Sequence, residues 1–503
     1  MKNPAPRWLS LDSAALKAWQ MLRLRHYLSD TVLPSHAAYS RSFALAKLRP
    51  PQLRDYTDLE RIPFTAKEDV AKAPRNYILT PDPAALARRP GTILAALTRG
   101  LDTVKEELER EYRPVMMTST TGRAAEPAPF LYTAHDIRML SMAGARVMRI
   151  CGATREMRMI NMFPFAPHLA FWQTHYAGTE FGVFVVSTGG GKALGTEGNL
   201  RLIRKIDPDV LIGVPTFLYH VLCAAVDDGI RCAKLSKIVL GGEKAPEGMR
   251  RRLRDLATQL GAHPVDILPT YGFTEAKMAF AQCPCANQAE MSGYHLNPDL
   301  GIVEVIDPAT GRQVPDGEPG EVVWTPLEAR GSVVLRYRTG DLISGGLVYG
   351  KCPHCGRAMP RLMGEISRTS EIREMRLEKL KGTLVDFNRL EHILDDCAEV
   401  STWQLEIRKT HDDPMEVDEL ILHVQKANGE SDESVRNILD RRFVEETETH
   451  PNRILFHTAE DLRRMQGVGS LLKEQRVVDH RPHAVTTTAQ PAKAESLAEP
   501  HHV

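Results

Sequence analysis

The sequence lacks any long uninterrupted apolar segment, which argues against a membrane-spanning helix. Its longest apolar stretch, residues 210–226, is interrupted by Gly213, Pro215, Tyr219 and His220. This pattern is typical of a buried strand followed by a helix. Residues 1–19 also lack the apolar core of a signal peptide. We therefore expect a cytoplasmic protein that has no membrane partner.

Neither sign of charge is in excess, since 64 lysines and arginines balance 64 aspartates and glutamates. A balanced chain offers no electrostatic attraction for nucleic acid or anionic lipid, so neither is an expected partner. The contents of hydrophobic (43%) and charged (25%) residues are ordinary for a globular protein. A chain of 503 residues has room for about three domain-sized units. We find no internal repeat.

Cysteine is sparse and unevenly placed, with eight residues in the chain. In a chain without an export signal, this favours free thiols and a bound metal over disulfides. Cys352 and Cys355 form a CxxC pair, which alone is also compatible with a redox centre or with buried thiols. Cys283, Cys285 and His295 lie upstream, and their ligand types favour tetrahedral zinc.

We expect a structural zinc site because protein side chains would fill all four positions. The predicted ligands are Cys283, His295, Cys352 and Cys355, with Cys285 as the alternative to Cys283. The other four thiols are expected in the core: Cys151, Cys223, Cys232 and Cys397.

Hydrophobic periodicity divides the chain into regions of different structural type. Residues 12–48 and 82–112 are predicted to be helical. From 115 to 280, short apolar runs alternate with amphipathic segments such as residues 247–260, which indicates βαβ units and a mostly parallel sheet. The predicted strands include residues 183–186, 210–212, 238–240 and 267–268.

Beyond about residue 300 the pattern changes to hairpin-type β structure. Val303 and Val305 flank a polar glutamate, residues 307–311 form a turn, and residues 322–324 form a further strand. After residue 368 the chain is charge-rich, as expected of a smaller mixed domain. Residues 483–503 are poor in large apolar side chains and are predicted to be disordered.

Four short motifs carry groups suited to a nucleoside triphosphate. Thr118–Gly122 offer hydroxyls and backbone N–H groups to phosphate, and Arg123 adds charge. Taken alone, this turn is more typical of an ST-rich turn that caps a helix. A Walker-type loop is excluded, because Ala193 follows Gly191-Lys192 and Val186 stands where the first glycine is required.

The second motif group lies at the ends of predicted strands. Gly241, Gly242 and Glu243 follow a strand and would let a ligand approach the backbone, although a simple turn explains them equally well. In Tyr271–Glu275, an aromatic ring beside a glycine suits a purine, and a Thr–Glu pair suits Mg²⁺. Tyr337–Asp341 adds a carboxylate that could hold a ribose.

Together these motifs resemble the adenylate-forming superfamily of acyl- and aryl-CoA ligases, in its phenylacetate–CoA ligase branch. The resemblance runs from about residue 20 to 482 and includes Leu59–Asp69 (LERIPFTAKED), Arg368–Glu371 (RTSE) and Leu472–Asp479 (LKEQRVVD). The sequence departs from the family pattern at Ser119 (usually Gly) and Arg123 (usually Lys). About five extra residues also precede Lys381-Gly382 in the hinge region.

The resemblance implies a role for each matching residue. Catalysis is assigned to Lys473, Glu275 and Thr274, with Glu275 also binding Mg²⁺, and Ser370 is the hinge. Nucleotide contacts are implied for Thr118, Ser119, Thr120, Thr121, Gly122, Arg123, Gly241, Gly242, Glu243, Tyr271, Gly272, Asp341 and Arg368. In residues 163–172, His168 and Trp172 are the candidates for the acyl pocket, whereas Phe163 and Leu169 are expected to pack in the core.

The implied fold is α/β, with a large N-terminal domain of mostly parallel sheets plus a β-rich subdomain, and a small mobile α+β C-terminal domain. The expected boundaries are 1–367 (with the zinc-bearing part at about 281–362), 368–482 and a tail at 483–503. The implied reaction uses ATP and Mg²⁺ to convert a carboxylic acid into an acyl-adenylate, which then passes to coenzyme A.

Three alternatives remain open. The acyl group could pass to the phosphopantetheine of an acyl carrier protein, or the reaction could stop at the adenylate, as in deazaflavin-adenylating synthetases. A non-catalytic zinc-stabilised binding protein is the third. A homodimer is retained as a hypothesis for the assembly.

Overall fold

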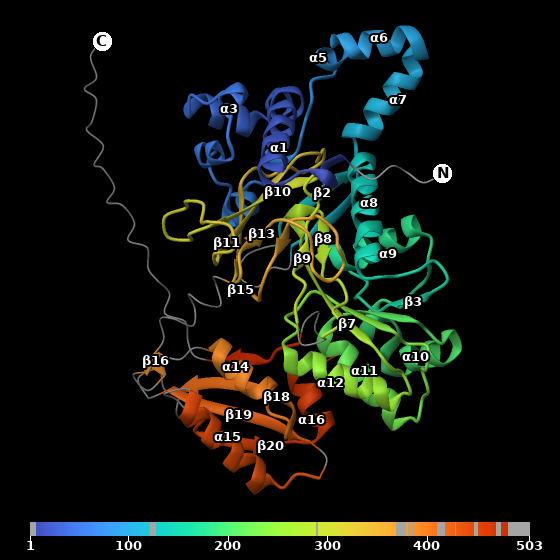
Figure 1. The fold of residues 1–503 in the computed structure, drawn as a ribbon, viewed down its shortest axis with the longest axis vertical. Helices are drawn as coiled ribbons and strands as arrows, with labels where there is room; N and C mark the ends of the chain where they lie inside the picture. The colour runs from blue at the N-terminus through green and yellow to red at the C-terminus, as the bar shows by residue number, and fades with distance from the viewer. Residues whose placement is uncertain are drawn as a thin grey trace, which may run out of the picture.

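The computed structural model describes residues 7–120, 127–287, 290–368, 379–380, 383–384, 387–409, 418–427, 429–446, 451–468 and 474–480. Most of these residues form a large α/β body, and a smaller module built from the C-terminal segments lies against one end of it (Figure 1). No helix in the described ranges combines the length and the apolar character that a membrane crossing needs.

A nine-stranded sheet forms the centre of the large body, in the order β13-β14-β9-β8-β7-β6-β5-β3-β4. From β4 to β7 neighbouring strands are parallel, and from β7 to β13 they are antiparallel. The strands are β3 (Arg158–Asn161), β4 (Phe184–Ser187), β5 (Val210–Gly213), β6 (Lys237–Leu240), β7 (Asp266–Phe273), β8 (Met278–Ala281), β9 (Tyr294–His295), β13 (Leu347–Val348) and β14 (Arg361–Leu362). The predicted α/β class is confirmed, with the parallel order confined to one half of the sheet.

Helices cover both faces of the parallel half because successive strand residues point to opposite sides. Met159, Val210 and Val239 pack on one face, whereas Ile160 and Leu211 pack on the other. The covering helices are α8 (Ala134–Ile150), α9 (Leu169–Phe181), α10 (Gly190–Ile206), α11 (Pro215–Asp227) and α12 (Glu247–Gln259). Strands buried on both faces explain why residues 210–226 read as one apolar run.

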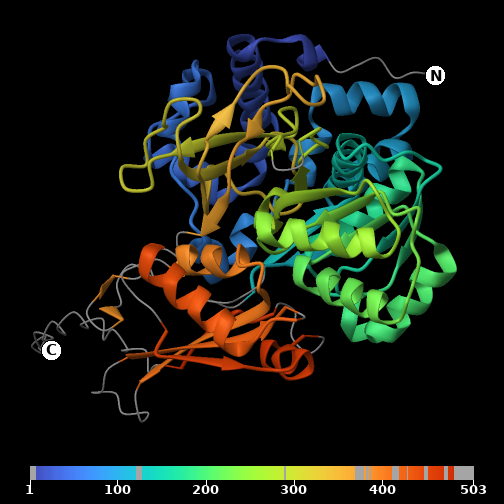
Figure 2. The same ribbon diagram turned by 60° about the horizontal axis from the view of Figure 1, so that its bottom comes forward.

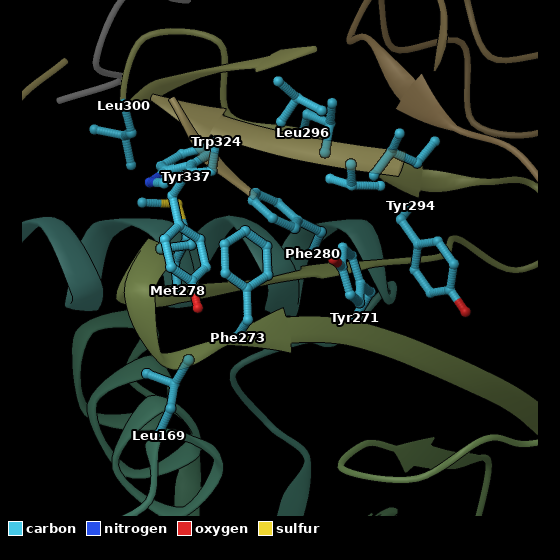
Figure 3. Packing of buried hydrophobic residues seen from close by; sticks show 14 of the residues in the cluster. Leu169, Tyr271, Phe273, Met278, Phe280, Tyr294, Leu296, Leu300, Trp324 and Tyr337 are labelled. Atoms are coloured by element: carbon cyan, nitrogen blue, oxygen red, sulfur yellow. The ribbon is translucent and has the colours of Figure 1, made fainter. Parts of the chain in front are cut away.

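A second, antiparallel sheet has the order β10-β11-β12-β15. Its strands are β10 (Gly301–Ile306), β11 (Gly320–Pro326), β12 (Tyr337–Ile343) and β15 (Ile366–Arg368). Aromatic side chains fill the space between this sheet and the antiparallel half of the nine-stranded sheet (Figure 3). The rings of Phe273 and Phe280 each lie 6.1 Å from that of Trp324.

The alternation at Val303–Val305 does not produce a solvent-facing strand. All of β10 is buried, and the Glu304 carboxylate lies 3.2 Å from the Arg336 guanidinium. Burial raises the pKa of Glu304, and Arg336 opposes that rise. The polar residue between the two valines is therefore part of a buried ion pair. The charge of Arg336 compensates the cost of burying the Glu304 carboxylate.

Helices make up most of the N-terminal part of the chain, and the first and third of them share an apolar core with β10 of the second sheet. The helices are α1 (Ser13–Tyr27), α2 (Leu33–Ser35), α3 (Ala37–Leu45), α4 (Lys67–Lys72), α5 (Pro83–Ala87), α6 (Pro90–Arg99) and α7 (Leu101–Tyr112). Helices α1 to α3 and α5 to α7 match the helical segments expected at residues 12–48 and 82–112, whereas α4 lies between those segments. A two-stranded ribbon, β1 (Pro114–Ser119) with β2 (Pro129–Thr133), follows them.

The C-terminal module has its own sheet, in the order β20-β19-β18-β21, and its own apolar core around Trp403 and Leu422. Its elements are α14 (Phe387–Asp395), β18 (Val400–Lys409), β19 (Asp418–Lys426), α15 (Asp432–Glu446), β20 (Arg453–Phe456), α16 (Ala459–Gln466) and β21 (Val477–Asp479), and a short hairpin β16 (Lys379–Leu380) and β17 (Thr383–Leu384) precedes them. Figure 2 shows helix α14 on the side facing the large body. The predicted tail at 483–503 lies outside the described residues.

A buried ion pair joins Asp136 of α8 to Lys277, the residue just before β8. Asp136 accepts hydrogen bonds from the backbone N–H groups of Thr133 (3.0 Å) and Gly331 (2.7 Å), and Lys277 Nζ donates to it at 2.9 Å. Asp136 and Lys277 are 2% and 5% exposed. Burial alone would raise the pKa of Asp136, but Lys277 and the N–H donors hold it below its ordinary value.

We expect Asp136→Ala to lower the free energy of unfolding by about 3–5 kcal/mol, because it leaves the Lys277 charge buried without its partner. The control is Asp12→Ala, which removes an exposed cap of α1 and should cost about 1 kcal/mol. Urea titration of both variants measures the difference. Because the folded pKa of Asp136 is depressed, its contribution is present above the unfolded pKa and is lost as the pH falls. Equal losses for the two variants would contradict this account.

Candidate active site

Two buried carboxylates lie where the nine-stranded sheet meets the second sheet. The Tyr271 hydroxyl donates to Asp341 Oδ2 at 2.9 Å, and the Tyr337 hydroxyl donates to Glu275 Oε1 at 2.6 Å. All four residues are at most 9% exposed. The Tyr271–Asp341 bond joins β7 to β12, and the Tyr337–Glu275 bond joins β12 to the short turn that follows β7.

The electrostatic environment of this pair favours a bound cation. Burial raises the pKa of Glu275, and the nearby Asp341 raises it further, whereas Tyr337 and Lys67 lower it. Two acidic groups in a dry site are costly unless positive charge joins them. Glu275 and Thr274 also offer the hard oxygen ligands that Mg²⁺ prefers. The donor set of these residues fits a magnesium ion, and the assignment of the ion to this site stays a prediction.

Lys67 and Tyr337 are functional candidates to which the sequence analysis gave no role. Both residues lie within segments that resemble family motifs. The sequence therefore pointed to the segments but gave these two residues no role. The structure connects the two segments: Thr65 N–H donates to the Arg336 carbonyl (3.2 Å), and Arg338 N–H donates to the Thr65 carbonyl (3.0 Å). Helix α4 is thereby held beside β12, and Lys67 contributes positive potential at Glu275.

The backbone at Gly241 and Gly242, just after β6, runs beside β7. We refer to residues 241–243 together with Gly272 as the shelf. Gly241 N–H donates to the Gly213 carbonyl at 3.1 Å, which continues the parallel pairing past the strand end. A Cβ at Gly241 would lie 2.6 Å from Thr270 Oγ1, so this position admits only glycine. Gly242 has φ +84° and is exposed. Its backbone is accessible at the carboxyl end of a parallel strand, where open α/β sheets bind ligands.

Glu243 and Gly272 complete this shelf. Glu243 Oε2 accepts a hydrogen bond from Thr216 Oγ1 at 2.7 Å. Gly272 is exposed in β7, next to Tyr271, and a Cβ there would lie 2.9 Å from Ala279 Cβ. The residues predicted to hold adenine are thus brought together along the adjacent strands β6 and β7.

The predicted phosphate loop begins inside a strand. Thr118 is fully buried in β1, and its hydroxyl donates to the Tyr132 hydroxyl at 3.2 Å. Ser119 N–H donates to the Pro167 carbonyl (2.6 Å), and Thr120 Oγ1 accepts from Ala128 N–H (3.0 Å). These residues form the stem of the loop. The remaining members lie outside the described residues: Thr121, Gly122 and Arg123.

The predicted acyl segment is attached to this stem. The His168 ring N–H at Nδ1 donates to the Ser119 carbonyl at 3.1 Å. Trp172 is half-buried, and its ring lies 5.3 Å from that of Phe171. Phe163 and Leu169 are buried in the core, as the sequence indicated. His168 therefore links the acyl segment to the loop that is expected to hold phosphate.

The remaining predicted residues belong to the C-terminal part of the chain. The backbone of Arg368 lies opposite Asp341 in the β12–β15 pairing. Ser370 and Lys473 lie outside the described residues. Glu474, the residue after Lys473, has its carboxylate 3.6 Å from His220 Nε2 in α11. Glu243 is also among the negative charges that raise the pKa of Arg476.

Close contacts hold the C-terminal module against α12 of the large body. The Arg252 guanidinium donates to the carbonyls of Cys397 and Ser401, each at 3.0 Å. A Cβ added at Gly248 would lie 1.9 Å from the Asp395 carbonyl oxygen, so the two backbones meet directly. Asp395 in turn accepts hydrogen bonds from Trp403 (3.0 Å) and Arg476 (2.9 Å).

The predicted zinc ligands converge at the antiparallel end of the nine-stranded sheet. The ligand atoms of Cys283, His295, Cys352 and Cys355 all lie within 4.8 Å of one another. Cys283 Sγ and Cys352 Sγ are 3.8 Å apart, and Cys355 Sγ lies 3.3 Å from His295 Nε2. Two thiolates about 2.3 Å from one tetrahedral zinc ion lie roughly 3.8 Å apart, so the spacing fits zinc.

His295 has the orientation and the charge state that a metal ligand needs. Its Nδ1–H donates to the Ala281 carbonyl at 3.2 Å, which directs the lone pair of Nε2 toward the cysteines. Burial lowers the pKa of His295 to about 4, so the ring is neutral at pH 7. Cys285 lies outside this group, and its thiol faces the Cys283 carbonyl at 3.7 Å. The geometry favours Cys283 over Cys285.

Comparisons with known proteins agree with this geometry. The family described as AMP-binding enzymes matches residues 120–328. The phenylacetate–CoA ligase of Thermus thermophilus is 27% identical over 369 residues, or 73% of each chain. That of Escherichia coli is 26% identical over 408 residues, or 80% of this chain and 82% of the relative.

A solved structure shares the complete fold. The 2-hydroxyisobutyryl-CoA ligase in its postadenylation state, in complex with an acyl-AMP, superposes with a TM-score of 0.72 and 18% identity. The match covers 96% of this chain and 94% of that one. The AMP-binding match and the phenylacetate–CoA ligase relatives support the class of AMP-forming acid–CoA ligases. By these matches the chain is similar to the adenylate-forming superfamily, in its phenylacetate–CoA ligase-like branch.

We expect the purified protein to carry one equivalent of zinc, measured by plasma mass spectrometry. Cys352→Ser should lose the metal and unfold at a lower temperature, because binding to a structural zinc site contributes directly to folding. The matched control is Cys285→Ser, which should keep both the zinc and the unfolding temperature of the wild type. Loss of zinc in the Cys285 variant, with retention in a Cys283→Ser variant, would reverse the ligand assignment.

Proposed function

We propose that the protein activates a carboxylic acid with ATP, releasing pyrophosphate, and then transfers the acyl group from the acyl-adenylate to the thiol of coenzyme A. The observation that carries this proposal is the pair of tyrosine-held carboxylates, Asp341 and Glu275, beside the open shelf at Gly241–Glu243. A ribose-binding acid and a metal-binding acid are the two groups that MgATP requires next to an accessible backbone.

In the first step, an acid oxygen forms a bond to the α-phosphorus of ATP, and the bond from that phosphorus to the bridging oxygen breaks. Both partners are anions, so positioning and charge neutralisation supply most of the catalysis. Magnesium, when bound, neutralises phosphate charge. We assign Thr274 and Glu275 to its site, Asp341 and Arg368 to the ribose, and Gly241, Gly242, Glu243, Tyr271 and Gly272 to the adenine.

The remaining roles follow the family assignment. We propose that Thr118–Arg123 enclose the leaving pyrophosphate and that Lys473 neutralises charge at the reacting phosphate. His168 and Trp172 line the acyl side. His168 is placed for this role because it is hydrogen-bonded to Ser119 at the base of the loop. No covalent enzyme intermediate is required.

We further propose that residues 368–482 form a mobile domain, separate from 1–367 and pivoting at Ser370. The contacts of Glu474 with His220, and the proximity of Arg476 to Glu243, support an arrangement in which the Lys473 segment faces the nucleotide shelf. Adenylation would use this docked arrangement. Thioester formation would require the domain to rotate, so that the Gly382 loop replaces Lys473.

The substrate class that we propose first is an aryl or arylalkyl acid. Phe165, Phe171, Trp172 and Tyr176 place several rings close together on the acyl segment and α9. The relatives named phenylacetate–CoA ligases point to the same class. A panel of aryl, short-chain, medium-chain and long-chain acids, scored by pyrophosphate release, tests it; a preference for long alkyl acids would overturn it.

The acceptor is tested separately. Adenylation followed by thioester formation with free coenzyme A supports the proposal. Adenylation without that thioester would point to a carrier-protein phosphopantetheine or to an enzyme that stops at the adenylate. If no acid supports ATP–pyrophosphate exchange, the ligase proposal fails and a non-catalytic binding role becomes the better explanation.

We expect Lys473→Ala to reduce ATP–pyrophosphate exchange by on the order of 100-fold or more, because it removes the positive charge that meets the transition state. Thioester formation from supplied acyl-adenylate should largely survive, since Lys473 has no part in that step. Rapid-quench assays of each half-reaction measure the split. Equal losses in both half-reactions would remove Lys473 from its assigned role.

Gly248→Ala tests the docked arrangement by sterics alone, because its Cβ would overlap the Asp395 carbonyl. We expect at least a tenfold loss of ATP–pyrophosphate exchange, again with thioester formation from supplied acyl-adenylate retained. The matched control is Gly91→Ala, where a Cβ meets nothing within 4 Å. Undiminished exchange in the Gly248 variant would show that adenylation does not use this arrangement.

A further inference from the structure

Helix α6 presents its large apolar side chains to solvent. No residue of this ten-residue helix is buried. Its large aliphatic residues are strongly exposed, with Ile93 at 47%, Leu94 at 63% and Leu97 at 80%, and Leu101 just beyond it at 72%. The residues that are partly shielded by the rest of the chain are small: Thr92, Ala95 and Ala96.

This orientation is the reverse of that of an ordinary surface helix, which turns its apolar stripe toward its own core. In α6 the small residues face the protein and the large aliphatic residues face outward. No charged residue interrupts the outer face between Pro90 and Thr98. A contiguous exposed apolar patch of this kind marks an interaction site.

The patch lies at an edge of the molecule. Helices α5, α6 and α7 extend from the large body, with α6 at the extremity farthest from the C-terminal module (Figures 1 and 2). A partner bound there would leave the Gly241–Glu243 shelf and the α12–α14 contact uncovered. The inference is therefore independent of the proposed reaction.

Charge at the two ends of the patch favours a second copy of this chain. Arg88 is exposed before α6 and Asp102 is exposed after it, and neither side chain has an ion-pair partner among the described residues. If two α6 helices pack antiparallel across a two-fold axis, Arg88 of each copy meets Asp102 of the other. Such a two-fold symmetric contact forms two Arg88–Asp102 ion pairs, one at each end. It also buries the apolar face of α6 in both copies.

A lipid surface fits the same patch less well. Interfacial helices are rich in basic residues beside their apolar face. Here the adjoining helix α7 brings acidic residues close to the patch, namely Asp102, Glu106, Glu107 and Glu109. Arg99, Arg110 and Arg113 pair with Glu107, Glu106 and Glu109, so little free positive charge lies beside the patch to attract anionic headgroups.

We propose that Ile93, Leu94, Leu97 and Leu101 form a homodimer interface in which two α6 helices pack antiparallel, with Arg88 and Asp102 closing its ends. Light scattering during size-exclusion chromatography of the full chain should give about twice the mass of one 56.2 kDa chain. The Leu94→Glu/Leu97→Glu variant should give the mass of one chain and keep wild-type ATP–pyrophosphate exchange. The control is Leu45→Glu, an apolar residue 85% exposed on α3, which should remain dimeric.

A charge exchange tests the antiparallel geometry. Arg88→Asp and Asp102→Arg should each raise the dimer dissociation constant by about tenfold, and the double variant should restore it. A monomeric wild type, or a Leu94/Leu97 variant that stays dimeric, would overturn the proposal. So would wild-type binding to phosphatidylcholine–phosphatidylglycerol vesicles that the Leu94/Leu97 variant loses, because that result assigns the patch to a lipid surface.

Discussion

The two tyrosine–carboxylate hydrogen bonds are the interactions on which the candidate site depends. Asp341 and Glu275 are far apart in the sequence, and each is held by a tyrosine from the opposite sheet. Strand β7 makes this possible because it pairs in parallel with β6 and antiparallel with β8. One strand thus belongs to the ligand-binding edge of the parallel half and to the wall shared with the second sheet. A shift between the sheets would separate both pairs.

The buried charges of this structure are of two kinds: those that are paired within the fold and those that we expect a ligand to pair. Asp136 with Lys277 and Glu304 with Arg336 are complete ion pairs within the fold, and they fix the segments that carry the site. Glu275 has no ion-pair partner among the residues that the structure describes, and burial with a neighbouring acid raises its pKa, which Lys67 only partly opposes. The large body therefore satisfies its structural charges and leaves an excess of negative charge where a metal–nucleotide complex is expected to bind.

Much of the fold could be predicted from periodicity alone. The strands near 210, 238 and 267 and the helix at 247–259 are long or apolar enough for local pattern to determine them. The zinc ligands could be selected because few residue types suit zinc and their spacing is restrictive. Glu304 was harder to interpret, because its burial depends on Arg336, a partner distant in the sequence. Thr118 reads as part of a loop, but its hydroxyl is engaged inside the β1–β2 ribbon.

Other features could not be predicted because they arise only in three dimensions. Tyr337 and Lys67 are functional candidates only because both act on Glu275 in the folded chain. The spacing of the three residues in the sequence does not indicate this. The contact between Gly248 and Asp395 is a close approach of two backbones, which leaves only an unremarkable glycine in the sequence. The outward-facing side chains of α6 were likewise hidden, because a predicted amphipathic helix is normally assumed to bury its apolar face.

The central claim is that Asp341, held by Tyr271, is a nucleotide ligand at the edge of β6 and β7. Calorimetric titration of AMP into the wild type and into Asp341→Ala tests it most directly, with Asp12→Ala as the control for an unrelated lost carboxylate. The account predicts that AMP affinity falls at least tenfold in the Asp341 variant and is unchanged in the control. Equal AMP affinity in all three proteins would contradict it.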